Sequence, residues 1–310
     1  MIRLGAVNID TSHPKAFFEI LHAGNRARYV AVYNDGFRGD DEVEGFIKMA
    51  GLEKRCSTVD ELAEMVDLGM IHGCNWDTHL SYIEPFLKLG KPVFIDKPIV
   101  GKMGDIKKLR EYAKQGAVIL GSSCMRYVPE ITKFLAIPIE ERGEIISIFS
   151  VCGVDEFNYA IHAVEAIGGL IDRGAISCEF LGGSNIGGTR GETYIVRYDN
   201  GVVATYSLTY DIWQKSVMTV LTSKQTYVLE LRGYDALLDR AISSVESGVV
   251  KTAPLEDLIE SILIMLAGRI SREQGGGPVR LDDIPADDPG FDGHAFERAY
   301  AAAAKKMYIT

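Results

Sequence analysis

In residues 1–121 the chain alternates short apolar runs with helical patterns, and this alternation constrains the fold more than any other feature. The apolar runs that we expect to be strands are residues 2–7, 28–35, 68–74, 92–96 and 117–123. The intervening patterns are typical of helices, as where Thr58 is positioned to be an N-cap with Glu61 three residues later. Strands that alternate with helices of this length form βαβ units, so we predict an α/β fold with a doubly wound parallel sheet.

After residue 121 the pattern changes to β-rich runs at short spacing, with turn formers such as residues 199–201 between them. One helical stretch, residues 159–171, interrupts the series, and helical patterns return after residue 234. Such a series predicts a mostly antiparallel, open sheet with helices. We therefore expect two domains, residues 1–121 with the parallel sheet and residues 122–310 with an α+β arrangement.

Composition and charge narrow the classes of function. The net charge of −10 and the pI near 5.2 give no overall basic footprint, so no nucleic-acid partner is expected. No apolar run is long enough to span a bilayer, and the first residues do not resemble a signal peptide, so no membrane partner is expected either. The five cysteines are scattered and form no CxxC pair, which favours a reducing cytoplasm and predicts no metal site.

Three strand ends carry a recognisable set of residues, and open parallel sheets bind ligands at the carboxyl ends of their strands. The segments are GAVNIDTSH at residues 5–13, CNWDTH at 74–79 with LGKPVFIDKP at 89–98, and MRYVP at 125–129 followed by NYAIHAVEAIGG at 158–169. Together they resemble the Gfo/Idh/MocA family of NAD(P)-dependent oxidoreductases. The most specific part is LGKPVFIDKP, which matches the family pattern AGKxVxxEKP.

The resemblance implies a Rossmann domain in residues 1–121, a sugar- or cyclitol-like substrate and hydride transfer at a nicotinamide. Lys97 corresponds to the family's active-site lysine, and His162 to the histidine that moves the hydroxyl proton. This chemistry is reasonable because an imidazole titrates near working pH and an ammonium stabilises a developing alkoxide. Asn158 stands where the family has an aspartate, and an amide cannot accept that proton. Asp155 or Glu156 is an alternative source of a carboxylate.

The same resemblance assigns the substrate contacts. They are Lys97, Arg126, Tyr127, Asn158, Tyr159 and His162. Arg126 and Glu165 each have an alternative interpretation. Arg126 also fits an ordinary salt bridge. Glu165 follows His162 by one helical turn and either orients the imidazole or lies on the helix surface.

The expected phosphate loop departs from the fingerprint G-x-G-x-x-G. Aligned from Gly5, the second glycine position holds Val7 and the third holds Asp10, which places bulk and negative charge near the phosphates. On the other side, Thr11 and Ser12 offer hydroxyls and Ser12 a helix cap, and His13 matches a histidine common in the family. The sequence indicates a remodelled cofactor loop, with Asp10 as a simple N-cap without ligand as the alternative.

The cofactor contacts implied by the resemblance extend over the other strand ends. They are Gly5, Asp10, Thr11, Ser12, His13, Asn34, Asp35, Cys74, Asn75, Trp76, His79, Asp96, Lys97 and Pro98. Asp35 favours NAD over NADP through the ribose 2′-hydroxyl, although Arg38 is close. Trp76 either stacks on a ring in the crevice or packs under its loop.

The sequence thus predicts a cytoplasmic NAD(P)-dependent oxidoreductase that acts on a secondary hydroxyl of a sugar, cyclitol or similar polyol. The alternative is a non-redox binding or regulatory protein on the same scaffold, since fold does not fix function. Val7, Asp10 and Asn158 motivate that alternative. We also expect a homodimer or homotetramer that assembles through the open sheet of the second domain.

Overall fold

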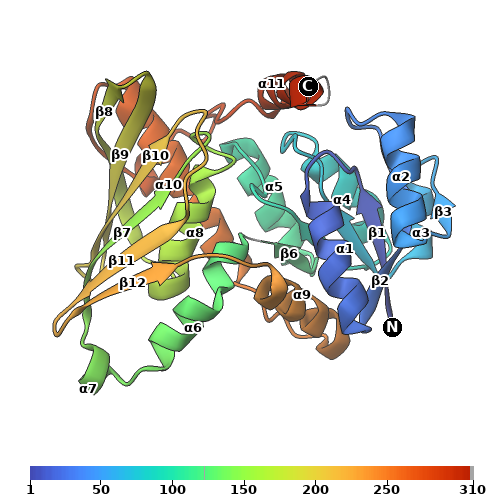
Figure 1. Ribbon diagram of the computed structural model, residues 1–310, viewed down its shortest axis with the longest axis horizontal. Coiled ribbons are helices and arrows are strands. Elements are labelled where there is room, and N and C mark those ends of the chain that lie inside the picture. Colours follow the sequence, from blue (N-terminus) through green and yellow to red (C-terminus); the bar gives the residue numbers. More distant parts are fainter. Residues whose placement is uncertain (122, 308–310) are drawn as a thin grey trace. The chain divides into compact units, whose positions relative to one another are not determined.

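The computed structural model describes residues 1–121 and 123–307 as two compact units (Figure 1). The first unit contains residues 1–121, Leu238–Leu255 and the C-terminal residues from Pro289, and the second contains residues 123–237 and 256–288. The border after residue 121 coincides with the division expected from the sequence. The later segments of the first unit had been expected in the second domain, and they join the first through contacts that the local pattern does not encode.

The first unit is built on a six-stranded parallel sheet with the strand order β3-β2-β1-β4-β5-β6, which confirms the predicted doubly wound arrangement. The strands are β1 (Ile2–Val7), β2 (Ala27–Tyr33), β3 (Lys54–Arg55), β4 (Leu68–Ile71), β5 (Val93–Ile95) and β6 (Ile119–Gly121). The helices between them are α1 (His13–Gly24), α2 (Asp40–Ala50), α3 (Val59–Met65), α4 (His79–Lys88) and α5 (Met103–Lys114). The order reverses between β1 and β4, so a ligand crevice is expected at the carboxyl ends of these two strands.

Local sequence signals explain several of these elements. The Thr58 hydroxyl accepts the Glu61 N–H at 3.1 Å and caps α3, as the sequence predicts. Gly5 lies inside β1, where an added Cβ would stand 2.9 Å from the Leu62 side chain of α3. The glycine therefore allows α3 to pack closely on the strand.

The second unit is built on a seven-stranded mixed sheet with the order β12-β11-β7-β10-β9-β8-β13. Only the β7–β10 pair is parallel, which confirms the predicted, mostly antiparallel sheet with helices. The strands are β7 (Ile145–Cys152), β8 (Ala175–Ile186), β9 (Thr189–Tyr198), β10 (Val203–Thr209), β11 (Val217–Thr222), β12 (Thr226–Glu230) and β13 (Gly277–Arg280). The turn between β9 and β10 falls at the predicted residues 199–201.

Helices cover one face of this sheet. Helix α8 (Ala160–Ile171) packs on β7 and β10, and Gly268 of α10 (Leu255–Glu273) lets that helix approach the Tyr206 hydroxyl, 3.0 Å from a Cβ built on the glycine. The remaining elements are η1 (Cys124–Tyr127), α6 (Pro129–Ala136), α7 (Ile139–Arg142), α9 (Asp235–Ser247), η2 (Leu281–Asp283) and α11 (Gly293–Met307). Within residues 1–121 and 123–307, no helix is long and apolar enough to cross a bilayer.

Candidate active site

The loop after β1 begins at Asn8, which has a left-handed backbone with φ of 64°. Gly5 and Val7 both lie within β1, so the alignment of the fingerprint on Gly5, Val7 and Asp10 is wrong by three residues. Asn8, Asp10 and His13 have the spacing of the three glycines. Asparagine tolerates the left-handed region better than most residues, and Asn8 therefore makes the turn that the first glycine usually makes.

The three side chains at these positions reach the ends of three different strands. Asn8 Oδ1 accepts the N–H groups of Asp35 and Gly36 after β2, at 2.9 and 3.1 Å. Asp10 Oδ2 accepts the Cys74 N–H after β4 at 3.1 Å. His13 Nδ1 donates to Asp96 Oδ2 after β5 at 2.7 Å. Side chains thus fill the space that glycines leave open in the fingerprint.

Asp10 is the member of this set whose buried carboxylate is incompletely hydrogen-bonded. Asp10 is 1% exposed, and its Oδ1 has no hydrogen-bond partner in the described parts of the chain. A Cβ on Gly36 would stand 2.1 Å from that oxygen. Burial raises the pKa of Asp10 to about 6, the Cys74 N–H opposes the shift, and the charge of Glu297 adds to it. A buried carboxylate with one donor therefore occupies the point where the strand order reverses.

Asp96, at the end of β5, is buried among donors. Besides His13, the His72 ring donates to Oδ2 at 3.2 Å, and the Lys97 N–H donates to Oδ1 at 2.8 Å. The Tyr29 hydroxyl lies 2.8 Å from His72 Nε2 and donates to it, because burial lowers the pKa of His72 and keeps the ring neutral. Burial alone would raise the pKa of Asp96, but the two imidazoles outweigh it and hold that pKa well below its usual range.

Lys97 follows this carboxylate directly and is half-buried, and its peptide bond to Pro98 is cis. In the signature Asp-Lys-Pro, the buried and hydrogen-bonded Asp96 carboxylate fixes the backbone from which the Lys97 side chain projects.

At the end of β2, two residues tie neighbouring loops together. Asn34 Oδ1 accepts the Ile9 N–H at 3.2 Å, and the Arg38 guanidinium donates to the Asp10 carbonyl at 2.9 and 3.1 Å. Asp35 is exposed, and its two carboxylate oxygens accept the hydroxyls of Tyr33 and Tyr82 at 3.0 and 2.6 Å. The Asp35 carboxylate is thus held rigidly at the position expected for a ribose contact.

The loop after β4 is covered by the C-terminal segment. Asn75 Nδ2 lies 2.8 Å from His294 Nδ1 and 2.9 Å from Glu297 Oε2. The Trp76 indole donates to the Phe291 carbonyl at 2.7 Å, and its ring lies 5.0 Å from that of Phe296. Trp76 is 2% exposed and packs under this segment, which is the second of the two roles left open by the sequence.

Two further residues of this loop are buried. Both ring nitrogens of His79 lie near carbonyl oxygens, Gly73 at 2.9 Å and Ile99 at 3.0 Å, so the imidazole ties the loops after β4 and β5 together. Burial raises the pKa of the Cys74 thiol above its ordinary value, with Asp10 adding to the effect. The thiol is therefore protonated at neutral pH.

In the second unit, His162 lies on α8 with its Nδ1 2.6 Å from the Ser123 hydroxyl. The sequence left Glu165 either to orient this ring or to lie on the helix surface; it is 3% exposed and accepts a hydrogen bond from Arg126 Nε at 2.6 Å. Arg126 is 5% exposed and also donates to Ser261 at 3.3 Å. The salt bridge that the sequence left as the alternative for Arg126 is therefore present.

The other predicted substrate residues gather near the start of α8. Asn158 and Tyr127 are buried, and Tyr159 is half-buried with its ring 6.0 Å from that of His162. Of the two carboxylates offered as substitutes, Asp155 accepts the N–H groups of residues 157 and 159 at Oδ1, and Glu156 pairs with Arg272 at 2.5 Å.

Sequence reasoning missed several residues of these sites. They are Asn8, His72, Tyr82, Ser123, Phe291, His294, Phe296 and Glu297. Asn8 and His13 had a signal in their spacing with Asp10, which matches the glycine spacing of the fingerprint. His72 had none, because it continues an apolar strand, and the C-terminal residues are distant in sequence from everything they contact.

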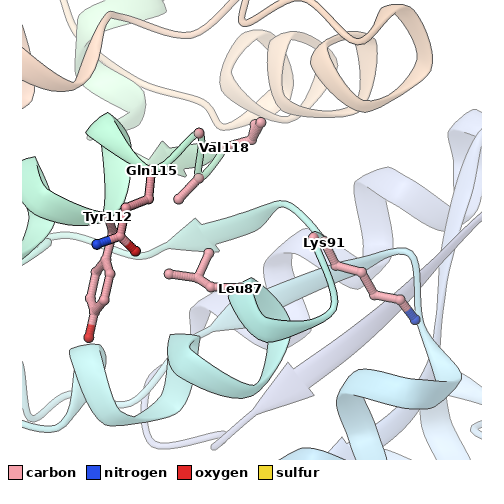
Figure 2. A pocket seen from close by; sticks show the side chains of 8 residues that line it. Leu87, Lys91, Tyr112, Gln115 and Val118 are labelled. Carbon is pink, nitrogen blue, oxygen red and sulfur yellow. The ribbon is translucent and has the colours of Figure 1, made fainter.

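The hollow drawn in Figure 2 lies at the opposite edge of the sheet. It has a volume of about 150 Å³ and is lined by residues that precede β5 and β6, among them Leu87, Tyr112 and Val118. Lys91 points away from it and donates to the Ala63 carbonyl at 2.8 Å (Figure 2). This hollow therefore presents no charged group to a ligand. No cluster of three or more His, Cys, Asp or Glu side chains in the described parts of the chain is arranged to hold a metal ion.

Comparison with known proteins gives a consistent result. Residues 5–123 match the family model described as an oxidoreductase family with an NAD-binding Rossmann fold. No curated protein matches the chain.

Solved structures of the same fold match nearly the whole chain. A scyllo-inositol dehydrogenase from Lactobacillus casei, with NAD(H) and scyllo-inositol bound, is 14% identical with a TM-score of 0.76 and covers 91% of this chain and 99% of its own. The myo-inositol dehydrogenase of that organism, in complex with NAD(H) and myo-inositol, is 14% identical with a TM-score of 0.75, covering 90% and 96%. An oxidoreductase from Thermotoga maritima is 17% identical with a TM-score of 0.73, covering 92% and 99%. At these identities the likeness shows the fold.

Proposed function

Because residues 5–123 of this chain belong to the Gfo/Idh/MocA family of oxidoreductases, we propose that the protein is an NAD-dependent oxidoreductase acting on a secondary hydroxyl of a sugar, cyclitol or similar polyol. The observation that carries the proposal is the end of β5. Asp96 is held there by three hydrogen bonds, and Lys97 keeps part of its side chain accessible. A lysine whose backbone is fixed in this way is better suited to contact a reacting hydroxyl than to be a solvated surface charge.

The residues at the carboxyl edge fit a dinucleotide at two points. Asp35, held by two tyrosine hydroxyls, suits a ribose 2′-hydroxyl. Thr11, Ser12 and His13 are at least partly accessible and offer polar groups to the phosphates. When bound, the nicotinamide accepts the hydride from the substrate carbon. Asp10 is the one group whose charge opposes the phosphates.

NAD fits this edge better than NADP. An exposed carboxylate at the end of β2 accepts a hydrogen bond from a 2′-hydroxyl but repels a 2′-phosphate. Arg38, the nearby cation, already donates to the Asp10 carbonyl and to Glu42 Oε1 at 2.8 Å. A 2′-phosphate would therefore have to compete for this guanidinium.

The hydroxyl proton is handled by Lys97 and His162. A lysine ammonium stabilises the alkoxide that develops as hydride leaves, and a neutral imidazole accepts the proton. Ser123 fixes the orientation of the His162 ring at Nδ1. Tyr127, Asn158 and Tyr159 complete the substrate contacts, with Asn158 as a hydrogen-bonding rather than a proton-accepting group.

The test is a titration of the full chain with NADH and NADPH followed by nicotinamide fluorescence, then NAD⁺ reduction across a panel of cyclitols and sugars. We expect micromolar binding of NADH, weaker binding of NADPH, and turnover that Lys97→Ala removes. Absence of binding up to millimolar concentrations, after a check for carried-through cofactor, contradicts the proposal.

A second candidate is a non-redox binding or regulatory protein on the same scaffold. Asp10 favours it, because this carboxylate already accepts the Cys74 N–H at the switch point. For this candidate Lys97→Ala leaves the biological role intact, whereas for the enzyme it abolishes turnover.

We also propose that the protein acts in the cytoplasm and assembles with a second copy through the outer face of the second sheet. Each of the five cysteines is a free, buried thiol. The exposed apolar side chains Phe149, Leu221 and Val228 lie on three neighbouring strands of that sheet, β7, β11 and β12. An exposed apolar patch can meet its own copy around a twofold axis.

Light scattering should therefore report more than one subunit, and Phe149→Lys should yield monomers. Val249→Lys is the control, because Val249 is exposed and follows α9, outside the second sheet. A monomeric native protein contradicts the assembly.

A further inference from the structure

The C-terminal residues 289–300, here called the strap, lie across the carboxyl edge of the first sheet (Figure 1). At the loop after β4 the strap accepts the Trp76 indole N–H and contacts the Asn75 amide through His294 and Glu297. Its Gly293 N–H donates to Asp77 Oδ2 at 2.8 Å. The loop that the family resemblance assigns to the cofactor is thus bound by the chain itself.

Glycines on both sides make this contact close. A Cβ on Gly290 would stand 1.9 Å from the Gly101 carbonyl oxygen, and a Cβ on Gly293 would stand 2.5 Å from Asn75 Oδ1. A Cβ on Gly101 would in turn stand 2.4 Å from Trp76 Nε1. The strap therefore occupies a fitted seat on the loops after β4 and β5.

From this seat the strap runs toward the end of β2. Phe296 stacks on Tyr300 with ring centroids 5.6 Å apart, and Tyr300 meets Phe37 of the loop after β2 at 5.9 Å. A dinucleotide in a doubly wound sheet extends along the same edge, across the crevice where the strand order reverses. The strap and a dinucleotide thus follow the same route.

The strap also carries charge to this crevice. Glu297 accepts from Asn75 at the loop after β4, and its charge adds to the rise that burial causes in the pKa values of Asp10 and Cys74. A carboxylate over the switch point repels phosphates, and Asp10 beneath it does the same. While seated, the strap therefore opposes a dinucleotide both sterically and electrostatically.

We propose that the strap is a built-in competitor of the dinucleotide, so that the cofactor binds only when residues 289–300 leave the edge of the sheet. This inference rests on the proposed function. The apparent dissociation constant for the cofactor is then the intrinsic one divided by the fraction of molecules with the strap displaced. By linkage, the bound cofactor displaces the strap to the same extent that strap release tightens binding.

The affinity test uses glycine variants of the full chain. Gly290→Ala places a Cβ against Gly101, and its control is Gly51→Ala, because the two glycines have φ of 65° and 63° but Gly51 faces open space. Gly293→Ala is paired in the same way with Gly104→Ala, which meets nothing within 4 Å. We expect each strap variant to bind NADH at least tenfold more tightly than its control. Affinities within twofold overturn the proposal.

A second readout follows the strap directly. The chain has 2 tryptophans, so Trp213→Phe leaves buried Trp76 as the only one. Saturating NAD⁺ should shift Trp76 emission to the red and increase its quenching by acrylamide, as Gly290→Ala should without cofactor. Cofactor binding with unchanged Trp76 emission overturns the strap's role alone. Failure of NADH to bind any chain, including those whose Trp76 reports a released strap, contradicts the proposed function and the strap's role with it.

Discussion

The loops after β1 and β5 each bury a carboxylate at the same edge of the sheet, but they surround it differently. Asp96 accepts from two imidazoles and one backbone N–H, whereas Asp10 accepts from the Cys74 N–H, leaves Oδ1 without a partner and feels the charge of Glu297. The pKa of Asp96 is therefore depressed and that of Asp10 raised. Burial of charge is compensated in the loop that keeps the family signature and uncompensated in the loop that has lost its glycines.

This contrast separates two roles at one edge. A satisfied carboxylate fixes backbone and keeps Lys97 in place, so the β5 loop behaves as a rigid support. An unsatisfied buried carboxylate lowers stability, and such a cost is usually retained where a group must change its partners. The β1 loop is thus the part of the site that we expect to rearrange when a ligand arrives.

The largest expected effect is on catalysis at the β5 loop. Lys97→Ala should lower kcat/KM for the polyol substrate by about 10³-fold, because it removes the cation beside the developing alkoxide. NADH affinity should change by less than about threefold, since the backbone set by Asp96 remains. Lys91→Ala, at the amino end of the same strand, is the matched control and should leave kcat/KM unchanged. If both variants changed kcat/KM equally, Lys97 would have no specific role in the reaction.

Asp96→Asn disrupts the fully hydrogen-bonded carboxylate of the loop after β5. All three neighbours of the carboxylate are donors, so either orientation of an amide turns its NH₂ group toward a donor. We expect a loss of about 3 kcal/mol in the free energy of unfolding at pH 7, measured with urea. Because the folded pKa of Asp96 is depressed, its contribution is present above the unfolded value and is lost as pH falls. The stability deficit of the variant should therefore shrink in acid.

Asp10→Asn should change the free energy of unfolding in the opposite direction, toward greater stability at neutral pH. The pKa of Asp10 is raised from 3.8 to about 6, so the folded state binds the proton more tightly than the unfolded state. Native stability should then fall as pH rises from about 4 through about 6, by up to about 3 kcal/mol at 1.4 kcal/mol per pKa unit. The variant should lose this slope and be more stable than the native protein at pH 8. Urea unfolding across pH measures it, and an unchanged slope assigns the titration to another group.

The alternation of strands and helices was sufficient to predict the parallel sheet, because each buried strand is an apolar run bounded by turn formers. The Asp96-Lys97-Pro98 signature was also readable, since its residues are adjacent. The position of the β1 turn was not, because Gly5 within the strand imitated a fingerprint glycine while Asn8 took the left-handed conformation. The partners of Trp76 and His162 were likewise beyond local sequence, as they lie on segments joined only by tertiary packing.

The smallest effect compares the helix that leaves the β1 loop with one that has an ordinary start. Ser12 precedes α1 in a helical conformation and makes no side-chain cap, whereas the Thr58 hydroxyl caps α3. The His13 N–H instead donates to Thr11 Oγ1 at 3.2 Å, so the hydroxyl of Ser12 is left out of the helix start. Thr58→Ala should cost about 1 kcal/mol and Ser12→Ala less than about 0.5 kcal/mol in the free energy of unfolding. If Ser12→Ala weakens NADH binding severalfold while stability is unchanged, the exposed hydroxyl serves the ligand rather than the fold, whereas a loss of stability equal to that of Thr58→Ala would make it a cap after all.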